Sequence, residues 1–309
     1  MAQKINVYQM VTDRIIEKMQ QGQIPWKKPW HLVGSGEEFA ISYTSRKPYS
    51  LLNQFLLGEP GEYLTWKQIE AAGGKVKKGE KSKFVVFYDR VMGKKEEVVK
   101  PEDGNEDEGE VKEVKFKYAL LRYYNVWHIN QTEGIESKIK PGEKLPCPNP
   151  INAADNAIIM YLMRETHLKF QNNKPSDRAF YSPVDDKVVV PMLEQFKVAA
   201  EYYSTTFHEF IHSTMTESRC NRKPDKGYAF FGDEDYSREE LVAEIGSAML
   251  CSNFGIDNEG TFKNSVAYLQ SWIKALRNDP KMIVWAAGRA EKAARYILGE
   301  KPEIAVETA

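Results

Sequence analysis

Two histidines with a glutamate between them lie in the C-terminal half of the chain: His208, Glu209 and His212. Residues four apart on a helix share a face, so both imidazoles can present a ring nitrogen to one metal ion, with Glu209 beside a metal-bound water. Zinc lowers the pKa of such a water to about 7, and the adjacent carboxylate takes the proton as hydroxide attacks a carbonyl. The spacing therefore predicts a hydrolytic metal site on a helix.

A third protein ligand has to come from elsewhere, and the segment 238–247 offers the best candidates. Glu240 and Glu244 share one helical face, and the small residues next to them let this helix pack close to the histidine helix. We therefore expect Glu240 to bind the metal and Glu244 to accept the outer N–H of a ligand histidine. Glu239 is the competing ligand, but it lies about 100° away from the Glu244 face.

Two His ligands, one Glu ligand and an open fourth position are typical of a catalytic zinc site. We expect Zn²⁺, with another divalent ion such as Mn²⁺ as the alternative. The competing interpretation is that the histidines are ordinary polar residues of a partly buried helix, but buried imidazoles and a carboxylate need partners, which a metal supplies. Three widely spaced cysteines form no Cys-x-x-Cys clip, and we interpret them as buried or incidental thiols: Cys147, Cys220 and Cys251.

Substrate contacts are less sharply indicated. Residues 188–190 form a β-like run that ends at Pro191, as an edge strand can, and an edge strand near the metal could hold a peptide by β-addition. A plain core strand is the equal alternative. Four tyrosines are candidates for stabilising an oxyanion, although aromatic residues at such positions usually belong to the core: Tyr181, Tyr202, Tyr203 and Tyr268.

The elements that must position these groups follow from hydrophobic periodicity. The C-terminal half reads as a helix at 154–166, strands at 179–182 and 187–190, and helices at 199–217, 237–252, 260–278 and 280–298. The N-terminal half reads as helices at 6–21, 48–58 and 62–72, with β-like runs at 84–88 and 118–129. An acidic, Gly-containing stretch at 94–117 cannot bury a core, so we expect a solvated hairpin tip or a disordered insertion. The order predicts an α+β protein with domains at 1–133 and 151–309, joined by a linker at 134–150.

The composition of the 309 residues agrees with this. The chain is 42% hydrophobic and 28% charged, close to globular averages. A formal net charge of -1 argues against a uniformly basic nucleic-acid binder but leaves room for a local basic patch. No secretory signal and no membrane-spanning stretch is recognisable, so we expect a cytoplasmic protein without a membrane partner.

Lysines and aromatic residues are interleaved in the N-terminal half. Cations that follow a phosphate backbone and aromatic faces that stack on unpaired bases are the two ingredients of sequence-tolerant single-strand binding. The alternative is a solvated turn next to ordinary core aromatics. The candidate DNA-binding residues are Trp26, Lys27, Lys28, Trp30, Tyr49, Trp66, Lys75, Lys77, Lys78, Lys81 and Lys83.

Nearly the whole chain resembles the ArdC-type antirestriction proteins of conjugative plasmids and related mobile elements. The resemblance lies in 48–57, 63–68, 73–83, 124–127 and 131–134 of the first half, and in 179–191, 208–212 and 239–244 of the second. It implies an N-terminal domain that binds single-stranded DNA, a C-terminal zincin-like metallopeptidase domain, and protection of incoming DNA from host restriction. It also fits His208, His212 and Glu240 as ligands and Glu209 as base.

Two functions of different classes follow. In the first, DNA binding brings an active metalloprotease to a protein or peptide substrate, for example one bound to the same DNA. In the second, the protein is a DNA-binding shield whose metal site is structural or nearly inactive. The presence of Glu209 favours the first, because a purely structural site has no need of a base.

Overall fold

The structure is a computed structural model that describes residues 6–27, 39–99, 110–139, 150–222, 234–256 and 266–300. Its N-terminal half contains a four-stranded sheet in the order β1-β2-β5-β4 and a small second sheet, β3-β6. The strands are β1 (Ala40–Ser42), β2 (Gly61–Thr65), β3 (Lys75–Val76), β4 (Lys83–Val99), β5 (Glu110–His128) and β6 (Thr132–Glu133). The described helices of this half are α1 (Val7–Gln20) and η1 (Pro25–Lys27) before the first strand, and α2 (Leu51–Leu57), α3 (Trp66–Ala71) and η2 (Ile129–Gln131) between the strands.

The predicted helix at 62–72 is in fact a strand followed by a helix. Tyr63 and Leu64 are fully buried in β2, which pairs with β5. The Thr65 side chain accepts a hydrogen bond from the Gln68 N–H, and the Gln68 side-chain oxygen accepts one from the Thr65 N–H, so α3 starts only at Trp66. A capping box thus separates two elements that periodicity alone had merged.

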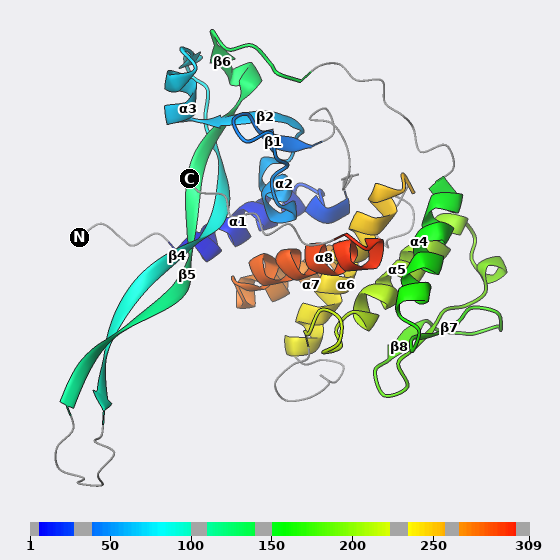
Figure 1. Ribbon diagram of the computed structural model, residues 1–309. Coiled ribbons are helices and arrows are strands. Elements are labelled where there is room, and N and C mark those ends of the chain that lie inside the picture. Colours follow the sequence, from blue (N-terminus) through cyan, green and yellow to red (C-terminus); the bar gives the residue numbers. More distant parts are fainter. Residues whose placement is uncertain are drawn as a thin grey trace.

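Strands β4 and β5 form a hairpin much longer than the sequence predicts. Their antiparallel ladder runs without interruption from the Lys83–Val126 pair to the Val99–Glu110 pair. Residues 94–99 and 110–117, expected as a loop, are therefore strand. Pairing of the two strands satisfies their backbone N–H and C=O groups, and this does not require a buried core. Residues 100–109 lie outside the described part. Figure 1 shows the hairpin as a twisted ribbon that leads away from the body of the molecule.

The C-terminal half is mainly helical and carries a three-stranded sheet, β7-β9-β8. Residues 188–190 were considered as an edge strand, but β9 lies between two neighbours, and Val188 and Val190 are fully buried. The short strand β7, which the sequence did not reveal, covers that side, so this is a core strand. The elements are α4 (Pro150–Arg164), β7 (Lys169–Gln171), β8 (Phe180–Ser182), β9 (Lys187–Val189), η3 (Leu193–Gln195), α5 (Ala199–Ser213), α6 (Glu234–Asn253), α7 (Val266–Asn278) and α8 (Met282–Leu298).

The two halves share one hydrophobic core. Helix α1 buries Val11 and Ile15 in the same cluster as residues of α6, α7 and α8, and the buried Thr12 hydroxyl donates to the Pro280 carbonyl at 2.8 Å. In Figure 1, α1 lies between the N-terminal sheet and the C-terminal helices. The domain boundary near residue 133 stays a prediction, since the first helix packs on the second half.

The start of the expected linker is held to the N-terminal sheet. Glu62 is fully buried and forms an ion pair with Arg46. Its carboxylate also accepts hydrogen bonds from the Ser137 hydroxyl at 2.7 Å and from the Lys138 backbone at 3.1 Å. Residues 140–149 lie outside the described part. Among the described residues, no helix is long and apolar enough to cross a membrane.

Candidate metal centre

Close packing of α5 against α6 brings the candidate ligands together. A Cβ atom on Gly246 would lie 2.6 Å from Cδ1 of Ile211, so only glycine allows α6 to approach α5 this closely. One residue on, the buried Ser247 hydroxyl donates to the Ser204 carbonyl of α5 at 2.7 Å. Small residues at 246–248 thus set the distance between the two helices, as the sequence predicted.

His208, His212 and Glu240 offer ligand atoms that all lie within 4.8 Å of one another. The Nε2 atoms of the two histidines are 3.1 Å apart. The Glu240 carboxylate lies 3.5 Å from His208 Nε2 and 3.3 Å from His212 Nε2. Two imidazole nitrogens and one carboxylate oxygen around a common point are a donor set for a divalent metal that leaves a position open.

Glu209 is mostly buried on the same helix, next in sequence to His208. Its negative charge contributes to raising the pKa of His212, so its carboxylate acts electrostatically on the ligand cluster. A carboxylate in this place can serve as a base for a water held at the open position.

Glu239 lies behind His212, because the Nδ1 atom of His212 is 3.5 Å from the Glu239 carboxylate. The expectation that Glu244 accepts from a ligand histidine stays a prediction. Glu239 is nearly fully buried, and it reaches the outer face of the ring because it precedes Glu240 and points about 100° away from it. The rotation of about 100° between successive helix residues argued against Glu239 as a metal ligand, and it places Glu239 behind the ligand His212.

Arg222 holds Glu239 in position and was not identified from the sequence. Its guanidinium, 2% exposed, donates to both Glu239 carboxylate oxygens, at 2.6 and 3.2 Å. It also donates to the Thr214 hydroxyl at 2.6 Å and the Ile211 carbonyl at 2.8 Å. Arg222 lies in an irregular segment after α5, where no periodic pattern marks it. The role of Arg222 becomes visible only in the fold, where the segment after α5 passes back across the end of that helix.

The electrostatics of the cluster favour a cation. Burial alone would lower the pKa of His212, but hydrogen bonds to Glu239 and Glu240 raise it to about 10. Burial would raise the pKa of Glu239 and of Glu240, yet their histidine contacts, with Arg222 beside Glu239, hold both pKa values below the ordinary range. The carboxylates thus stabilise positive charge between them, which is what a bound divalent metal provides.

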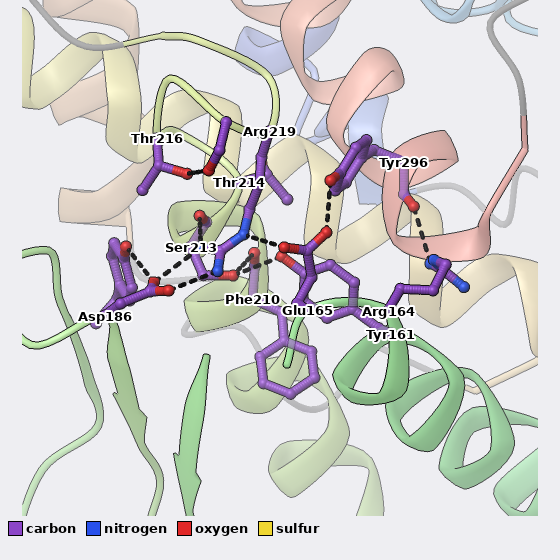
Figure 2. A network of polar contacts seen from close by, with 12 residues as sticks. Tyr161, Arg164, Glu165, Asp186, Phe210, Ser213, Thr214, Thr216, Arg219 and Tyr296 are labelled. Carbon is purple, nitrogen blue, oxygen red and sulfur yellow. Dashed lines mark hydrogen bonds and ion pairs between the residues drawn. The ribbon is translucent and has the colours of Figure 1, made fainter. Parts of the chain in front are cut away.

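A second buried arginine braces the C-terminal end of the metal helix (Figure 2). The Arg219 side chain donates to Glu165 at 2.8 Å, to Asp186 at 2.6 and 2.8 Å, and to the Ser213 carbonyl at 2.7 Å. Asp186 also accepts from Tyr181, and Glu165 from Tyr296. The network joins the end of α5 to α4, α8 and the β8–β9 turn.

The other candidates of the C-terminal half have structural partners. The hydroxyl of Tyr181 donates to Asp186, that of Tyr202 accepts from Asn172, and that of Tyr203 donates to Asp155. The side chain of Tyr268 lies outside the described part. Cys220 and Cys251 are buried free thiols, as expected, and Cys147 lies outside the described residues.

The described N-terminal candidates differ in how accessible their side chains are. Trp26 is 1% exposed and packs against Phe55, so it cannot stack on a base. Tyr49 is also buried, whereas Trp66 is 50% exposed and packs edge-on against Trp127. Burial contradicts the prediction for Trp26, because sequence composition does not distinguish a core indole from a stacking one. Lys28 and Trp30 lie outside the described residues, and Lys27 is described only as the end of η1.

The lysine-rich segment 75–83 is mostly exposed, but several of its ammonium groups are engaged. Lys75 forms an ion pair with Glu133 at 3.1 Å, and Lys77 donates to the Asn130 carbonyl at 2.7 Å. Lys83 is half-buried and contacts Glu59 and the Leu57 carbonyl. Lys78 and Lys81 are exposed. Within the described residues, the ammonium groups of these two lysines form no ion pair.

Comparisons with known proteins agree with this arrangement. Residues 5–127 match the family model of the N-terminal domain of anti-restriction factor ArdC, and residues 158–289 match a zincin-like metallopeptidase. A crystal structure of metal-free antirestriction ArdC from plasmid R388 is 30% identical, with a TM-score of 0.64, over 96% of this chain and 100% of that one.

The Mn(II)-bound structure of that protein is 28% identical, with a TM-score of 0.67, over 97% of this chain and 100% of that one. A DNA primase TraC of Escherichia coli is 33% identical over 97% of this chain, which spans only 28% of the primase. The donor set and the Mn(II)-bound relative together indicate a divalent metal.

Proposed function

The chain belongs to the family of ArdC antirestriction proteins, and from this we propose that it protects DNA of a mobile element from host restriction, binding the DNA as a single strand and carrying a zinc metalloprotease site. We assign DNA binding to the domain at 1–133 and hydrolysis to the domain at 151–309. A plasmid-encoded ArdC and a primase TraC among its relatives support the mobile-element context.

The observation that carries the protease assignment is the ligand cluster of His208, His212 and Glu240 beside Glu209. When bound, the metal activates a water molecule for attack on a peptide carbonyl. We assign to Glu209 the uptake of the proton and its transfer toward the leaving amine. Glu239 and Arg222 fix the orientation of the His212 ring. Zn²⁺ suits two imidazoles and a carboxylate, and Mn²⁺ is the alternative.

The DNA assignment rests on accessible charge and aromatic surface. Lys78 and Lys81 are exposed, and the Trp66 ring is half-exposed on the same half of the chain. Lysines bind phosphates without regard to sequence, and an exposed indole can stack on any unpaired base. We infer that a DNA-associated protein is the substrate, brought to the metal site by binding to the same strand.

Glu209→Gln tests whether hydrolysis is part of the function. The substitution removes the base but preserves the shape of the side chain, so metal content and oligonucleotide affinity should stay at wild-type levels. Protection of an unmodified plasmid entering a restricting host should be lost. Glu217→Gln, the same change at an exposed position after α5, is the matched control and should protect fully. If Glu209→Gln also protects fully, the protein is a DNA-binding shield rather than a protease.

A further inference from the structure

A pocket of about 420 Å³ lies where the two halves of the chain meet. Its walls come from the segment before α2, from β4 and β5 of the N-terminal sheet, and from α8 of the C-terminal half. None of the metal-centre residues lines it. A volume of this size is in the range of small-molecule and single-residue sites rather than of a packing defect.

The walls of this junction pocket are aromatic. Tyr88 lines it and is 55% exposed, although its hydroxyl lies 3.4 Å from that of Tyr8 on α1. Phe87 and the buried Tyr49 form another part of the wall, with ring centroids 6.1 Å apart. A large exposed aromatic ring beside a cavity favours a flat, π-bonded occupant.

The rim of the pocket carries positive charge. Lys47 is exposed, and within the described residues its ammonium group forms no ion pair. Arg295 forms ion pairs with Glu291 at 3.2 Å and with Glu300 at 2.7 Å, so its charge is compensated. The other oxygen of Glu291 accepts the Leu51 N–H at 3.0 Å, which ties α2 to α8. Lys47 is therefore the rim cation that an anionic group attached to a flat ring would meet.

Gly288 opens the floor of the pocket. A Cβ atom built on it would have no neighbour within 4 Å, so no packing contact requires glycine at this position of α8. Glycine is less favourable than alanine inside a helix. Gly288 therefore leaves open space in front of α8 and makes the helix less stable than alanine would. This is expected for a surface that a ligand approaches.

We propose that the junction pocket binds one unpaired nucleotide of single-stranded DNA, with its base against Tyr88 over Gly288 and its phosphate near Lys47. The proposal rests on the single-strand binding proposed above and adds to it a specific site. A base in a duplex is already stacked and paired, so only an unpaired one can enter. Because α8 belongs to the C-terminal half, a strand bound here contacts both halves of the protein.

Gly288→Phe tests the proposal by filling the pocket from its floor. We expect the affinity for a fluorescent oligo(dT), measured by anisotropy, to fall about 10-fold, since stacking of one base contributes this much. Tyr88→Ala, which removes the exposed ring, should cause a similar loss. Ser271→Phe places the same side chain at an exposed position of α7 outside the pocket and is the matched control.

A strand with the same phosphates but no bases separates stacking from charge. Wild-type protein should bind this abasic strand at least 10-fold more weakly than oligo(dT), and the preference for oligo(dT) should be about 10-fold smaller in Gly288→Phe. Thermal unfolding checks that both variants fold. If folded Gly288→Phe and Tyr88→Ala bind oligo(dT) like wild type, the junction pocket is not the site, and the proposed single-strand binding stands without it.

Two further outcomes are decisive. If thymidine monophosphate binds the wild type as tightly as the oligonucleotide does, the pocket takes a free nucleotide and the strand proposal is overturned. If wild-type protein binds no oligonucleotide at all, the proposed single-strand function fails, and the pocket proposal fails with it.

Discussion

The metal centre and the lysine-rich N-terminal surface differ in how their residues come together. At the metal centre, two helices place three ligand atoms within 4.8 Å, and the buried Arg222 holds Glu239 behind His212. On the N-terminal side, exposed charge lies at Lys78 and Lys81, and the candidate Trp26 belongs to the core. Residues chosen for their helical spacing come together in the fold. Lysines and aromatic residues chosen by composition need not, because the same residue types also have ordinary structural roles.

The difference has an energetic consequence. Residues that share partners respond to mutation together, so single changes around the metal centre should have large effects. Separated surface charges should act additively and weakly. Five measurements test this contrast, beginning with the largest expected effect.

Arg222→Ala should be the most disruptive change. It leaves the buried Glu239 carboxylate without its arginine, which costs about 3–5 kcal/mol of unfolding free energy. It should also weaken metal binding about 10–100-fold, because Glu239 orients His212. Denaturant unfolding of metal-free protein and calorimetric metal titration measure the two effects. Arg219→Ala is the control: it removes a similarly buried arginine that contacts no ligand, so stability should fall with little loss of metal affinity. Equal losses of metal affinity would show that Arg222 acts only through folding.

Gly246→Ala should separate α5 from α6. The added methyl group would overlap Ile211, and overpacking of this kind costs about 1–3 kcal/mol. Metal affinity should fall as well, since the ligands lie on both helices. Chemical unfolding and metal titration of the same preparation measure both. A variant with wild-type stability would mean that the helix distance tolerates a methyl group.

Asp186→Asn should weaken the brace at the end of α5 by about 1.5 kcal/mol, the lower range for a hydrogen bond to a charged group. Hydrogen bonds from Arg219 and Tyr181 outweigh burial and hold the pKa of Asp186 below its ordinary 3.8. A depressed pKa contributes stability that is present above the ordinary value and is lost as pH falls below it. The difference between wild type and variant should therefore be constant near neutral pH and shrink below about pH 4. A difference that does not change with pH would exclude the charged carboxylate as its source.

The double substitution Lys78→Ala with Lys81→Ala should have a small, additive effect on DNA. The slope of log K against log salt should fall by roughly 1.4, about 0.7 for each lysine on a single strand. Sequence preference should not change. Lys169→Ala with Lys174→Ala, two exposed lysines of the C-terminal half, should leave the slope as it is. If both pairs change the salt dependence equally, DNA binding depends on the overall positive charge of the surface rather than on Lys78 and Lys81.

Gly288→Ala should be the mildest change and has the opposite sign. The new methyl group meets nothing within 4 Å, so the helix propensity of alanine should raise the unfolding free energy by about 1 kcal/mol. Thermal unfolding measures it. A loss of stability would show that α8 needs glycine for a reason other than open space.

Much of the fold follows from local patterns. The spacing of apolar residues predicted α1 and the late helices α5 to α8, each within several residues of its observed bounds. Periodicity failed where two elements adjoin, as at Thr65, and where a strand was only three residues long, as in β7. A short strand has too few residues for its alternation to be recognised.

The sequence by itself determined the helix that carries His208, Glu209 and His212. Once this helix forms, a spacing of four residues places both histidines on the same face. The tertiary structure decided that Glu239 lies behind His212, because this contact depends on the approach of α6 and on Arg222 returning after α5. It likewise decided that Trp26 is buried and that a pocket opens between α2, β4 and α8. These features depend on contacts between segments far apart in the chain, and no local periodicity encodes such contacts.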